Sequence, residues 1–542
     1  MTKRCFLLCF TLLLISVSLF PEDYENEIYR IRDVSFDIKG KTKSFAILII
    51  TEIKTGDILN GKEKLEEYIA DKEHLLLNKR IFSTASIEYN IDRENETINE
   101  DDTATMRREV NTKTAIPVDL IVHTVDSGNF MLFPEPKYSS DSGLELSLKA
   151  IHYNFLGTGS PLEAKFGYLD LLSDIGEFSK QSITAGMESN IPFIAAGLIW
   201  NVKFDNTLNY FFDEPLSYKN TTGISVNIPV LSSKITAGFD QKTSIHEPYD
   251  FDDEKILNKS NVKDLIFFSS VLFAKWKIPT GIELKFLGPL VYTPSVASTF
   301  NYGAPNQDFG IHTGTILDLS HTLGFDSINW QGNFRKGFRI TAENNNFYHF
   351  SFSEWNIDLA LTAIGHFQIT DFFAISSRLK FEQWFDKDGK VEILTRFKAG
   401  EMLRGVSNKS INADNILSLN LNFYFLVLKF RTDYVFNLLK FKSTEKFNAY
   451  NFRYINFDLH IGPIFDFAFI KGSVINKYRN TILPLDWNFF ATAGLEIIFL
   501  PEAFRSIYLR FSFGWNLNSA FEPYSTVFSS DPEIFMGLGA YF

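Results

Sequence analysis

Strictly alternating runs of apolar and polar residues are the feature that most constrains the fold of this chain. From Leu417 to Phe425 every second residue is Leu or Phe, and the residues between them are Ser, Asn or Tyr. The segments Ile455–Gly462 and Ile507–Asn516 alternate in the same way. A period of two is typical of a β-strand with one apolar and one polar face. A tilted strand needs roughly ten residues to cross a bilayer, whereas the strands of soluble proteins are nearer five or six.

The composition supports strands that face lipid. The chain has 56 Phe, 21 Tyr and 7 Trp against only 6 Met, and aromatic residues favour strands over helices. The polar faces are rich in Asn, Ser, Gly and Tyr, which suits an enclosed lumen better than a soluble sandwich or propeller, the alternative fold. Because strands in lipid must satisfy every backbone group, they close into an antiparallel transmembrane β-barrel. The net charge of −12 excludes binding to nucleic acid.

The barrel is predicted to span residues 138–542. Its first strand is expected at Leu144–Phe155 and its last at Ile534–Phe542, where apolar residues again alternate. These 405 residues accommodate sixteen strands at roughly 25 residues each, strand and loop together. Sixteen is the expected number, and twelve to eighteen also fit the length.

Residues 1–18 are predicted to be a removable secretion signal. Two basic residues precede the apolar run 6–15, and small residues follow it. The alternative is an anchoring helix, for which the run is short. Cys5 and Cys9, the two cysteines of the chain, lie in this segment, so the exported chain is expected to lack cysteine and any disulfide.

Residues 27–126 are charged and mix helical with strand periodicity, as is typical of a soluble α+β domain. The periodicity predicts the order β-α-α-β-β. Residues 92–114 are acidic and almost free of apolar side chains, as expected of an insertion between the last two strands. The expected elements are strands 28–38, 82–91 and 118–125 and helices 42–53 and 62–80.

Three turns give this domain a resemblance to POTRA domains. A strand ends at Gly40, the turn Gly56-Asp57 follows the first helix, and the segment Leu77–Ser83 joins the second helix to the next strand. This order of turns is similar to the recurring POTRA signature. The resemblance implies a single POTRA-like domain that lies in the periplasm.

Two further segments and a loop motif resemble the BamA/TamA family of outer-membrane assembly factors, also known as bacterial surface antigens. Phe133–Tyr138 and Asn154–Gly159 are similar to the start of the family's barrel. Leu403-Arg404-Gly405-Val406 resembles the aliphatic-Arg-Gly-aromatic motif of a loop that folds back into the lumen. Val406 is a departure, because the family has Phe or Tyr at this place.

The resemblance also implies partners for the loop and a weak closure of the barrel. Asp466 and Asn422, both on the polar side of their strands, match the positions whose side chains hold the arginine, although the family has glutamate where Asn422 stands. A buried arginine needs such planar acceptors. At the other end of the sheet, the last strand is expected to pair only partly with the first. The residues expected at this seam are Gly537, Gly539 and Phe542.

The function implied by the resemblance is assembly of proteins in the bacterial outer membrane. The POTRA domain would receive unfolded polypeptides and the barrel would insert them into lipid, with periplasmic chaperones or accessory lipoproteins as further partners. Two alternatives stay open, a dedicated translocation pore of the two-partner or type V-like kind and a structural or adhesive barrel. The nine histidines show no metal-ligand spacing and no Gly-x-Ser-x-Gly motif occurs, so we expect no enzyme, no metal and no cofactor.

Overall fold

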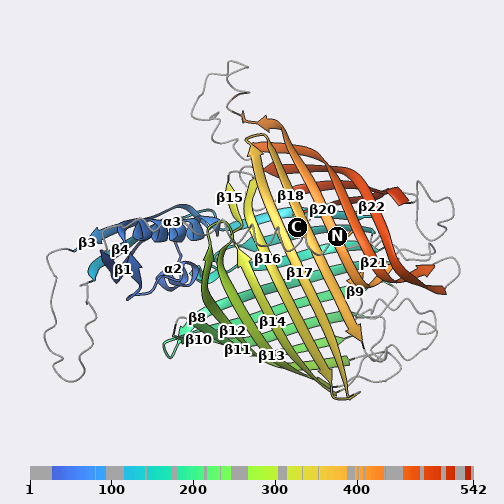
Figure 1. Cartoon of the computed structure of the whole chain (residues 1–542), viewed down its shortest axis with the longest axis horizontal. Coiled ribbons are helices and arrows are strands. Elements are labelled where there is room, and N and C mark those ends of the chain that lie inside the picture. The colour runs from blue at the N-terminus through green and yellow to red at the C-terminus, as the bar shows by residue number, and fades with distance from the viewer. Residues whose placement is uncertain are drawn as a thin grey trace, which may run out of the picture. The chain divides into compact units, whose positions relative to one another are not determined.

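The chain forms two compact units, one ending at Ser127 and the other beginning at Gly128 (Figure 1). The segments 1–18 and 93–114 of the sequence predictions lie outside the described residues. The computed structural model describes residues 27–79, 81–92, 115–140, 143–171, 180–212, 216–231, 233–245, 266–302, 314–331, 334–351, 353–386, 397–398, 402–406, 411–432, 434, 456–476, 481–501, 508–518 and 532–538.

The N-terminal unit is a sheet with two helices. Its described elements are β1 (Ile28–Lys39), α2 (Ser44–Thr51), β2 (Ile58–Asn60), α3 (Lys62–Asn78), β3 (Phe82–Ile91) and β4 (Ile116–Asp126). The strand order is β2-β1-β4-β3, with β1 and β4 parallel and the other neighbours antiparallel. The core is apolar and fully buried, and includes Ile31, Ile47, Leu65, Leu76 and Leu120.

The predicted order β-α-α-β-β lacks one strand of this unit. The sheet has four strands among the described residues, because β2 pairs antiparallel with the start of β1. Three residues are too few to display a period of two, so the pattern could not reveal β2. The predicted helices and the other three strands are present, with ends shifted by a few residues.

The predicted turns pack closely against other elements. The position of a Cβ on Gly40 would lie 2.2 Å from the carboxylate carbon of Asp126, so a larger residue does not fit there. The amide nitrogens of Lys41 and Thr42 donate to that carboxylate at 2.7 and 3.1 Å. The turn at Gly56 has a φ of 95°, and its amide donates to the carbonyl of Ile31 at 2.7 Å. The following residue, Asp57, accepts a hydrogen bond from the Tyr68 hydroxyl of α3 at 2.8 Å.

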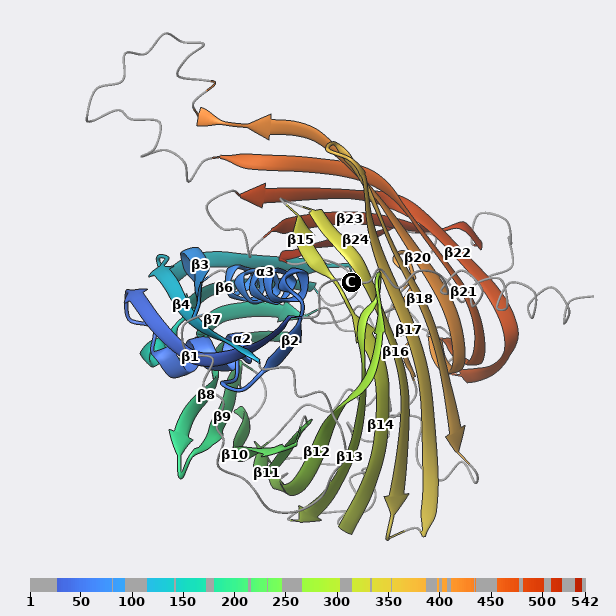
Figure 2. The same ribbon diagram turned by 60° about the vertical axis from the view of Figure 1, so that its left-hand side comes forward.

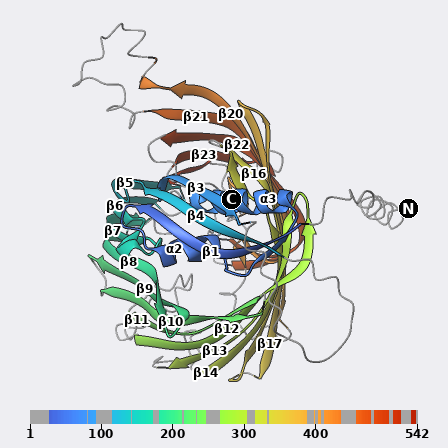
Figure 3. The same ribbon diagram turned by 90° about the vertical axis from the view of Figure 1, so that its left-hand side faces the viewer.

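The second unit is a closed antiparallel barrel (Figures 1 and 3). Its strands are β5 (Phe130–Ser139), β6 (Gly143–His152), β7 (Leu162–Leu171), β8 (Lys180–Ala195), β9 (Leu198–Phe211), β10 (Ser217–Val230), β11 (Ser233–Ile245), β12 (Ile266–Leu284), β13 (Gly288–Tyr302), β14 (Gly314–Asp326), β15 (Asn329–Gln331), β16 (Phe334–His349), β17 (Glu354–Thr370), β18 (Phe373–Asp386), β19 (Phe397–Lys398), β20 (Ile411–Phe430), β21 (Phe457–Asn476), β22 (Thr481–Pro501), β23 (Leu509–Asn516) and β24 (Glu533–Leu538).

The barrel has 18 strands within the described residues, so the expected number of sixteen is wrong. The short β15 and β19 pair with β16 and β20, whose full-length neighbours are β14 and β18, and are not counted as separate strands. Several connections are tight turns, such as Ala196–Gly197 between β8 and β9 and Asp371–Phe372 between β17 and β18. The assumed average of roughly 25 residues for each strand and its loop was therefore too long, and it gave too few strands.

The barrel also begins earlier than predicted. Its first strand is β5, which starts at Phe130, so the expected boundary at Tyr138 falls inside a strand. The expected first strand, Leu144–Phe155, corresponds to the second strand β6 and the turn after it. Pro134 and Pro136 interrupt the alternation in β5, and this is why the pattern did not identify it.

The predicted division into an apolar outer and a polar inner face is present. On β20, Leu417 and Phe425 are exposed on the outside, whereas Ser418, Asn420 and Asn422 are buried on the inside. Outward phenylalanines stack between neighbouring strands, as in the Phe373–Phe425 pair with ring centroids 4.6 Å apart. Such a continuous exposed apolar surface is stable only against lipid. No helix among the described residues is long and apolar enough to cross a membrane.

Candidate functional site

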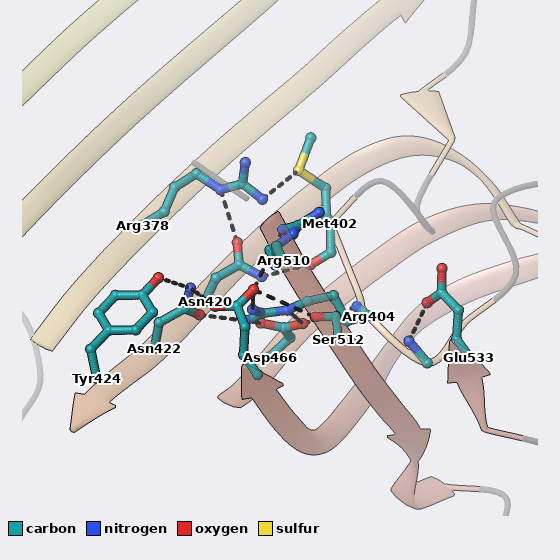
Figure 4. Close-up of polar contacts among 12 residues, drawn as sticks. Arg378, Met402, Arg404, Asn420, Asn422, Tyr424, Asp466, Arg510, Ser512 and Glu533 are labelled. Atoms are coloured by element: carbon teal, nitrogen blue, oxygen red, sulfur yellow. Dashed lines mark hydrogen bonds and ion pairs between the residues drawn. The ribbon is translucent and has the colours of Figure 1, made fainter. Parts of the chain in front are cut away.

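The loop residues 402–406 lie buried inside the barrel, and Arg404 is their anchor (Figure 4). Its Nε donates to Asp466 Oδ2 at 2.9 Å and its Nη2 donates to Asp466 Oδ1 at 2.6 Å, a bidentate pair. The backbone N–H of Arg404 donates to the same carboxylate at 2.9 Å. Its Nη2 also donates to the Asn422 amide oxygen at 2.7 Å. The structure therefore brings together Arg404, Asp466 and Asn422, as the sequence predicted. Both the guanidinium and the backbone amide of Arg404 hold the loop in place.

Asn422 connects this arginine to an acid that the sequence analysis did not identify. The Asn422 amide nitrogen donates to Glu496 Oε2 at 3.2 Å and to the Tyr424 hydroxyl at 2.6 Å. Glu496 on β22 lies 3.8 Å from Arg404 Nη1 and 3.5 Å from Arg510 Nη1 on β23. Two buried arginines thus share two buried acids, which keeps the cluster neutral. The neutral amide of Asn422 suits this place because a carboxylate there would face Glu496.

An apolar seat holds the rest of the loop. Leu403 is fully buried and Val406 is 2% exposed, so the predicted motif residues around Arg404 are all in the interior. They pack against inward-facing apolar side chains at one end of β20, β21 and β22, where polar residues are otherwise usual. These side chains are Ala413, Ile416, Ala468, Ile470 and Phe490. A break in the polar inner pattern was the available signal for this seat.

Two glycines let the loop lie directly on the barrel wall. A Cβ on Gly405 would come within 2.8 Å of the backbone of Gly514 and Trp515 on β23, and the φ of Gly405 is 102°. A Cβ on Gly514 would come within 2.6 Å of the Arg404 carbonyl carbon. Both positions therefore require glycine, because backbone packs on backbone.

The loop also contacts the last described strand. The Gly405 amide donates to the Glu533 carboxylate of β24. The Arg510 guanidinium lies over the ring of Phe535, also on β24, at 4.3 Å from its centroid. Through these two contacts the loop cluster reaches the strand that closes the barrel.

The barrel closes through a seam that is short within the described residues. Among the described residues, β24 and β5 share two residue pairs, Phe535 with Ser139 and Met536 with Tyr138. The other neighbouring long strands share at least six pairs each. Gly537 is buried on the inside of β24, whereas the predicted seam residues Gly539 and Phe542 lie outside the described residues.

A proline explains why the pairing of β5 with β24 stops short of Leu538. The Ser140 amide donates to the Ile534 carbonyl, so even-numbered residues of β5 direct their backbone groups toward β24. Pro134 and Pro136 have this parity and have no N–H to donate. Continuing the register by two residues places Leu538 opposite Pro136, where its carbonyl meets no donor. Pro136 thus limits pairing at the end of the described seam, and the predicted role of Gly537 and Gly539 stays a prediction.

The apolar outer face, the polar lumen and the clasped arginine loop define the chain as a transmembrane β-barrel with an N-terminal α/β unit. No group of three or more His, Cys, Asp or Glu side chains in the described part of the chain is arranged to hold a metal ion. Neither a protein-family model nor a curated protein matches the sequence.

Among solved structures, the chain is similar to BamA from Haemophilus ducreyi lacking POTRA domains 1–3. The identity is 14%, the match covers 94% of this chain and 84% of that chain, and the TM-score is 0.40. It is also similar to CdiB from Acinetobacter baumannii, with 13% identity, 94% and 74% coverage and a TM-score of 0.44. CdiB from Escherichia coli matches with 8% identity, 96% and 93% coverage and a TM-score of 0.39.

Proposed function

We propose that this chain is a bacterial outer-membrane barrel that inserts unfolded polypeptides into the membrane through its seam. The seam between β24 and β5 is the observation that carries the proposal. Two residue pairs hold it among the described residues, and Pro136 prevents its extension. A sheet edge that separates at little cost in hydrogen bonds can pair with the edge of an incoming strand.

The N-terminal unit supports this role as a receiver of unfolded chains in the periplasm. Among the described residues its sheet ends at β3, whose ten residues have β4 as their strand neighbour. An edge strand of this length can bind an extended polypeptide through backbone hydrogen bonds, which tolerate many sequences. Outer-membrane lipid, periplasmic chaperones and accessory lipoproteins are the further partners that this role requires.

A second candidate is a pore that translocates one dedicated secreted polypeptide. The strand number favours it, because barrels of about 16–18 strands are wide enough to leave an aqueous channel. The chain would then use its lumen rather than its seam.

A disulfide across the seam separates the two candidates. Tyr138→Cys with Met536→Cys joins directly opposed residues of β5 and β24, in a Cys5→Ala, Cys9→Ala background. The control is Leu146→Cys with Tyr168→Cys, which joins β6 to β7. Each variant replaces the native protein in the cell, and quantitative proteomics of the outer-membrane fraction then measures the amount of each barrel protein. We expect a broad loss of barrel proteins with the seam disulfide and recovery on reduction.

Two other results would change the conclusion. Loss of a single secreted polypeptide on depletion of the protein, with other barrels intact, would identify the translocation pore. Undiminished assembly by the locked seam would contradict the insertion role.

A further inference from the structure

Four polar side chains cluster on the outer face of the barrel, on β13, β14 and β16. The exposed Leu323 marks the outward positions of β14, and the registers extend this alternation to the neighbouring strands. We call the four residues the outer polar patch; they are Tyr292, His321, Asn344 and Asn346. His321 and Asn344 are directly opposite each other in the register. Figure 2 shows the three strands side by side in one wall of the barrel.

The outer polar patch lies in the part of the wall that crosses the membrane. On β16 the outward rings of Phe338 and Tyr348 are separated by roughly the length of strand that a tilted crossing of a bilayer needs. Each ring contacts an aromatic residue of β17, Phe338 with Phe367 and Tyr348 with Trp355. Aromatic residues of this kind mark the two edges of the apolar band. Asn344 lies between the two edges and therefore faces lipid tails.

The patch satisfies only part of its own hydrogen-bonding capacity. Tyr292 Oη lies 2.7 Å from His321 Nδ1, and whichever of these atoms donates, one N–H or O–H of the pair is left without an acceptor among the described residues. The Asn346 amide nitrogen donates to the Asn344 amide oxygen at 2.6 Å and to the Leu319 carbonyl at 3.0 Å. The Asn344 amide nitrogen has no hydrogen-bond partner in the described part of the chain. Because lipid tails accept no hydrogen bonds, these donors require a polar partner inside the membrane.

The chemistry of the patch fits a second copy of the same surface. Amide, imidazole and phenol groups both donate and accept, so two patches related by a twofold axis are complementary to each other. The outward residues of segments 292–302, 315–325 and 338–348 include no Asp, Glu, Lys or Arg. An anionic lipid headgroup therefore finds no cation on this face, and a charged protein surface finds no counter-charge.

The patch lies on the side of the barrel opposite the seam. Counted along the 18 strands, β14 is eight steps from β24 and nine steps from β5. Two barrels that meet at this face would therefore keep both seams away from the contact.

We propose that two copies of this chain associate side by side in the membrane, with their outer polar patches facing each other across a twofold axis. The Asn344 amide of each copy then bonds to a polar group of the other copy, as does the donor left over on Tyr292 and His321. Polar side chains join membrane-spanning segments in this way, because the alternative is an unpaired group in lipid. The pairing does not depend on the proposed function, and it leaves both seams free to open.

Counting subunits in lipid vesicles tests the pairing without any client. Full-length protein in the cysteine-free background carries one dye at Lys64→Cys, an exposed position of α3, and is reconstituted at a range of densities. We expect most particles to bleach in two steps. Asn344→Leu and His321→Leu should each lower the association constant about tenfold, the effect of losing one polar contact in lipid. The matched control is Thr222→Leu, which removes an outward hydroxyl on β10 and should leave the association unchanged.

Cross-linking locates the contact on the barrel. Ala342 is the outward residue before Asn344 on β16 and is exposed, so Ala342→Cys lies beside the expected twofold axis. Copper-catalysed oxidation in vesicles should convert it to disulfide-linked dimers. Ala185→Cys, at an outward alanine six strands away on β8, is the control. It should cross-link about tenfold more slowly, because association raises the effective concentration of thiols only at the contact.

Folded mobility on unheated gels identifies variants with an intact barrel, and leucine at an outward position suits lipid. Single bleaching steps at every density, or two-step particles that persist in both leucine variants, would overturn the pairing. Equal cross-linking at positions 342 and 185 would do the same. If the purified protein is single and position 342 cross-links to a different membrane protein in cells, that protein occupies the patch and the second copy is refuted. Failure of client assembly would contradict the proposed function and leave these results untouched.

Discussion

Asn422 and Glu496 face each other across the inner wall of the barrel, with the amide nitrogen of Asn422 3.2 Å from the Glu496 carboxylate. The opposite side of the same amide accepts from Arg404 at 2.7 Å. A neutral group thus connects a buried cation to a buried anion, and the acid required to balance Arg510 comes from β22.

This relationship predicts that a charge at position 422 is harmful. Asn422→Asp keeps the shape but opposes two carboxylates and removes the donor to Glu496, so we expect a loss of about 3 kcal/mol in the free energy of unfolding. Adding Glu496→Gln returns a donor and removes the repulsion, and should recover a large part of that loss. Guanidinium unfolding in lipid vesicles, followed by tryptophan fluorescence, measures both. Additive losses in the double variant would contradict the coupling.

The bidentate pair predicts that lysine cannot replace Arg404. Arg404→Ala leaves Asp466 buried without its cation and should cost about 3–5 kcal/mol, and Asp466→Asn should be similarly harmful. Arg404→Lys should recover only a minor part, because a point charge does not reproduce the planar fork. The control is Arg339→Lys in the exposed pair with Asp326, where we expect a change below about 1 kcal/mol. Equal stability of Arg404→Lys and the unmodified protein would show that the fork is unimportant.

The glycine contact predicts that small side chains expel the loop. Gly405→Ala or Gly514→Ala places a methyl group within 2.8 Å of opposing backbone. The reporter is Met402→Cys, which is 6% exposed when the loop is seated and should become labelled by a water-soluble maleimide when it is not. Gly186→Ala is the control, because its Cβ would lie 3.4 Å from its nearest neighbour. Slow labelling in all three variants would contradict the prediction, because it would mean that the barrel wall shifts enough to accept the added methyl group.

The parity of Pro136 predicts a seam that can be lengthened. Pro136→Val adds an N–H that faces Leu538, so we expect one further hydrogen bond and a stabilisation of the seam of about 1 kcal/mol. Hydrogen exchange at Ile534 and Tyr138 should slow, and client assembly should fall. Pro192→Val on β8, away from the seam, should change neither. Unchanged exchange with Pro136→Val would refute the explanation by proline.

The ion pairs of Arg32 predict that the stability of the N-terminal unit depends on pH. Arg32 donates through Nε to Asp119 at 2.8 Å and through Nη1 to Asp92 at 2.8 Å, and its hydrogen bond holds the pKa of Asp119 below the usual value. A lowered pKa in the folded state gives stability that is complete above the unfolded pKa of about 4 and is lost as the pH falls through the folded value. Hydrogen exchange of β1 and β4, corrected for intrinsic rates, should therefore show loosening at low pH. Asp119→Asn should loosen them at neutral pH and flatten the profile.

The alternation of apolar and polar side chains made most of the fold predictable from the sequence. In β20, β21 and β23 it identified the strands and both faces correctly, because lipid and lumen impose opposite demands on successive residues. It failed at β5, where two prolines replace the alternating residues, and at the three-residue β2. The strand number depended on turn lengths, which no pattern of alternation determines.

The site was predictable only where a motif and strand parity coincided. Asp466 and Asn422 were identified in this way and both contact Arg404. Glu496, Arg510 and Glu533 also lie on inward positions, but their meeting with the loop depends on how far it descends into the lumen. That depth follows from Gly405 lying on Gly514, a contact between residues far apart in the chain.

The hydrogen bond from Gly405 to Glu533 spans 128 residues of sequence. The loop precedes in the sequence the five strands that it touches, from β20 to β24. Its arginine has its partners on β20, β21 and β22, whereas the Gly405 amide meets its acceptor only on β24. The contact between Gly405 and Glu533 therefore requires the closing strand to be in place, and its presence marks a barrel whose wall is finished. A chain truncated before Glu533 would keep the arginine and its acids and would still lack the contact that ties the loop to the closing strand.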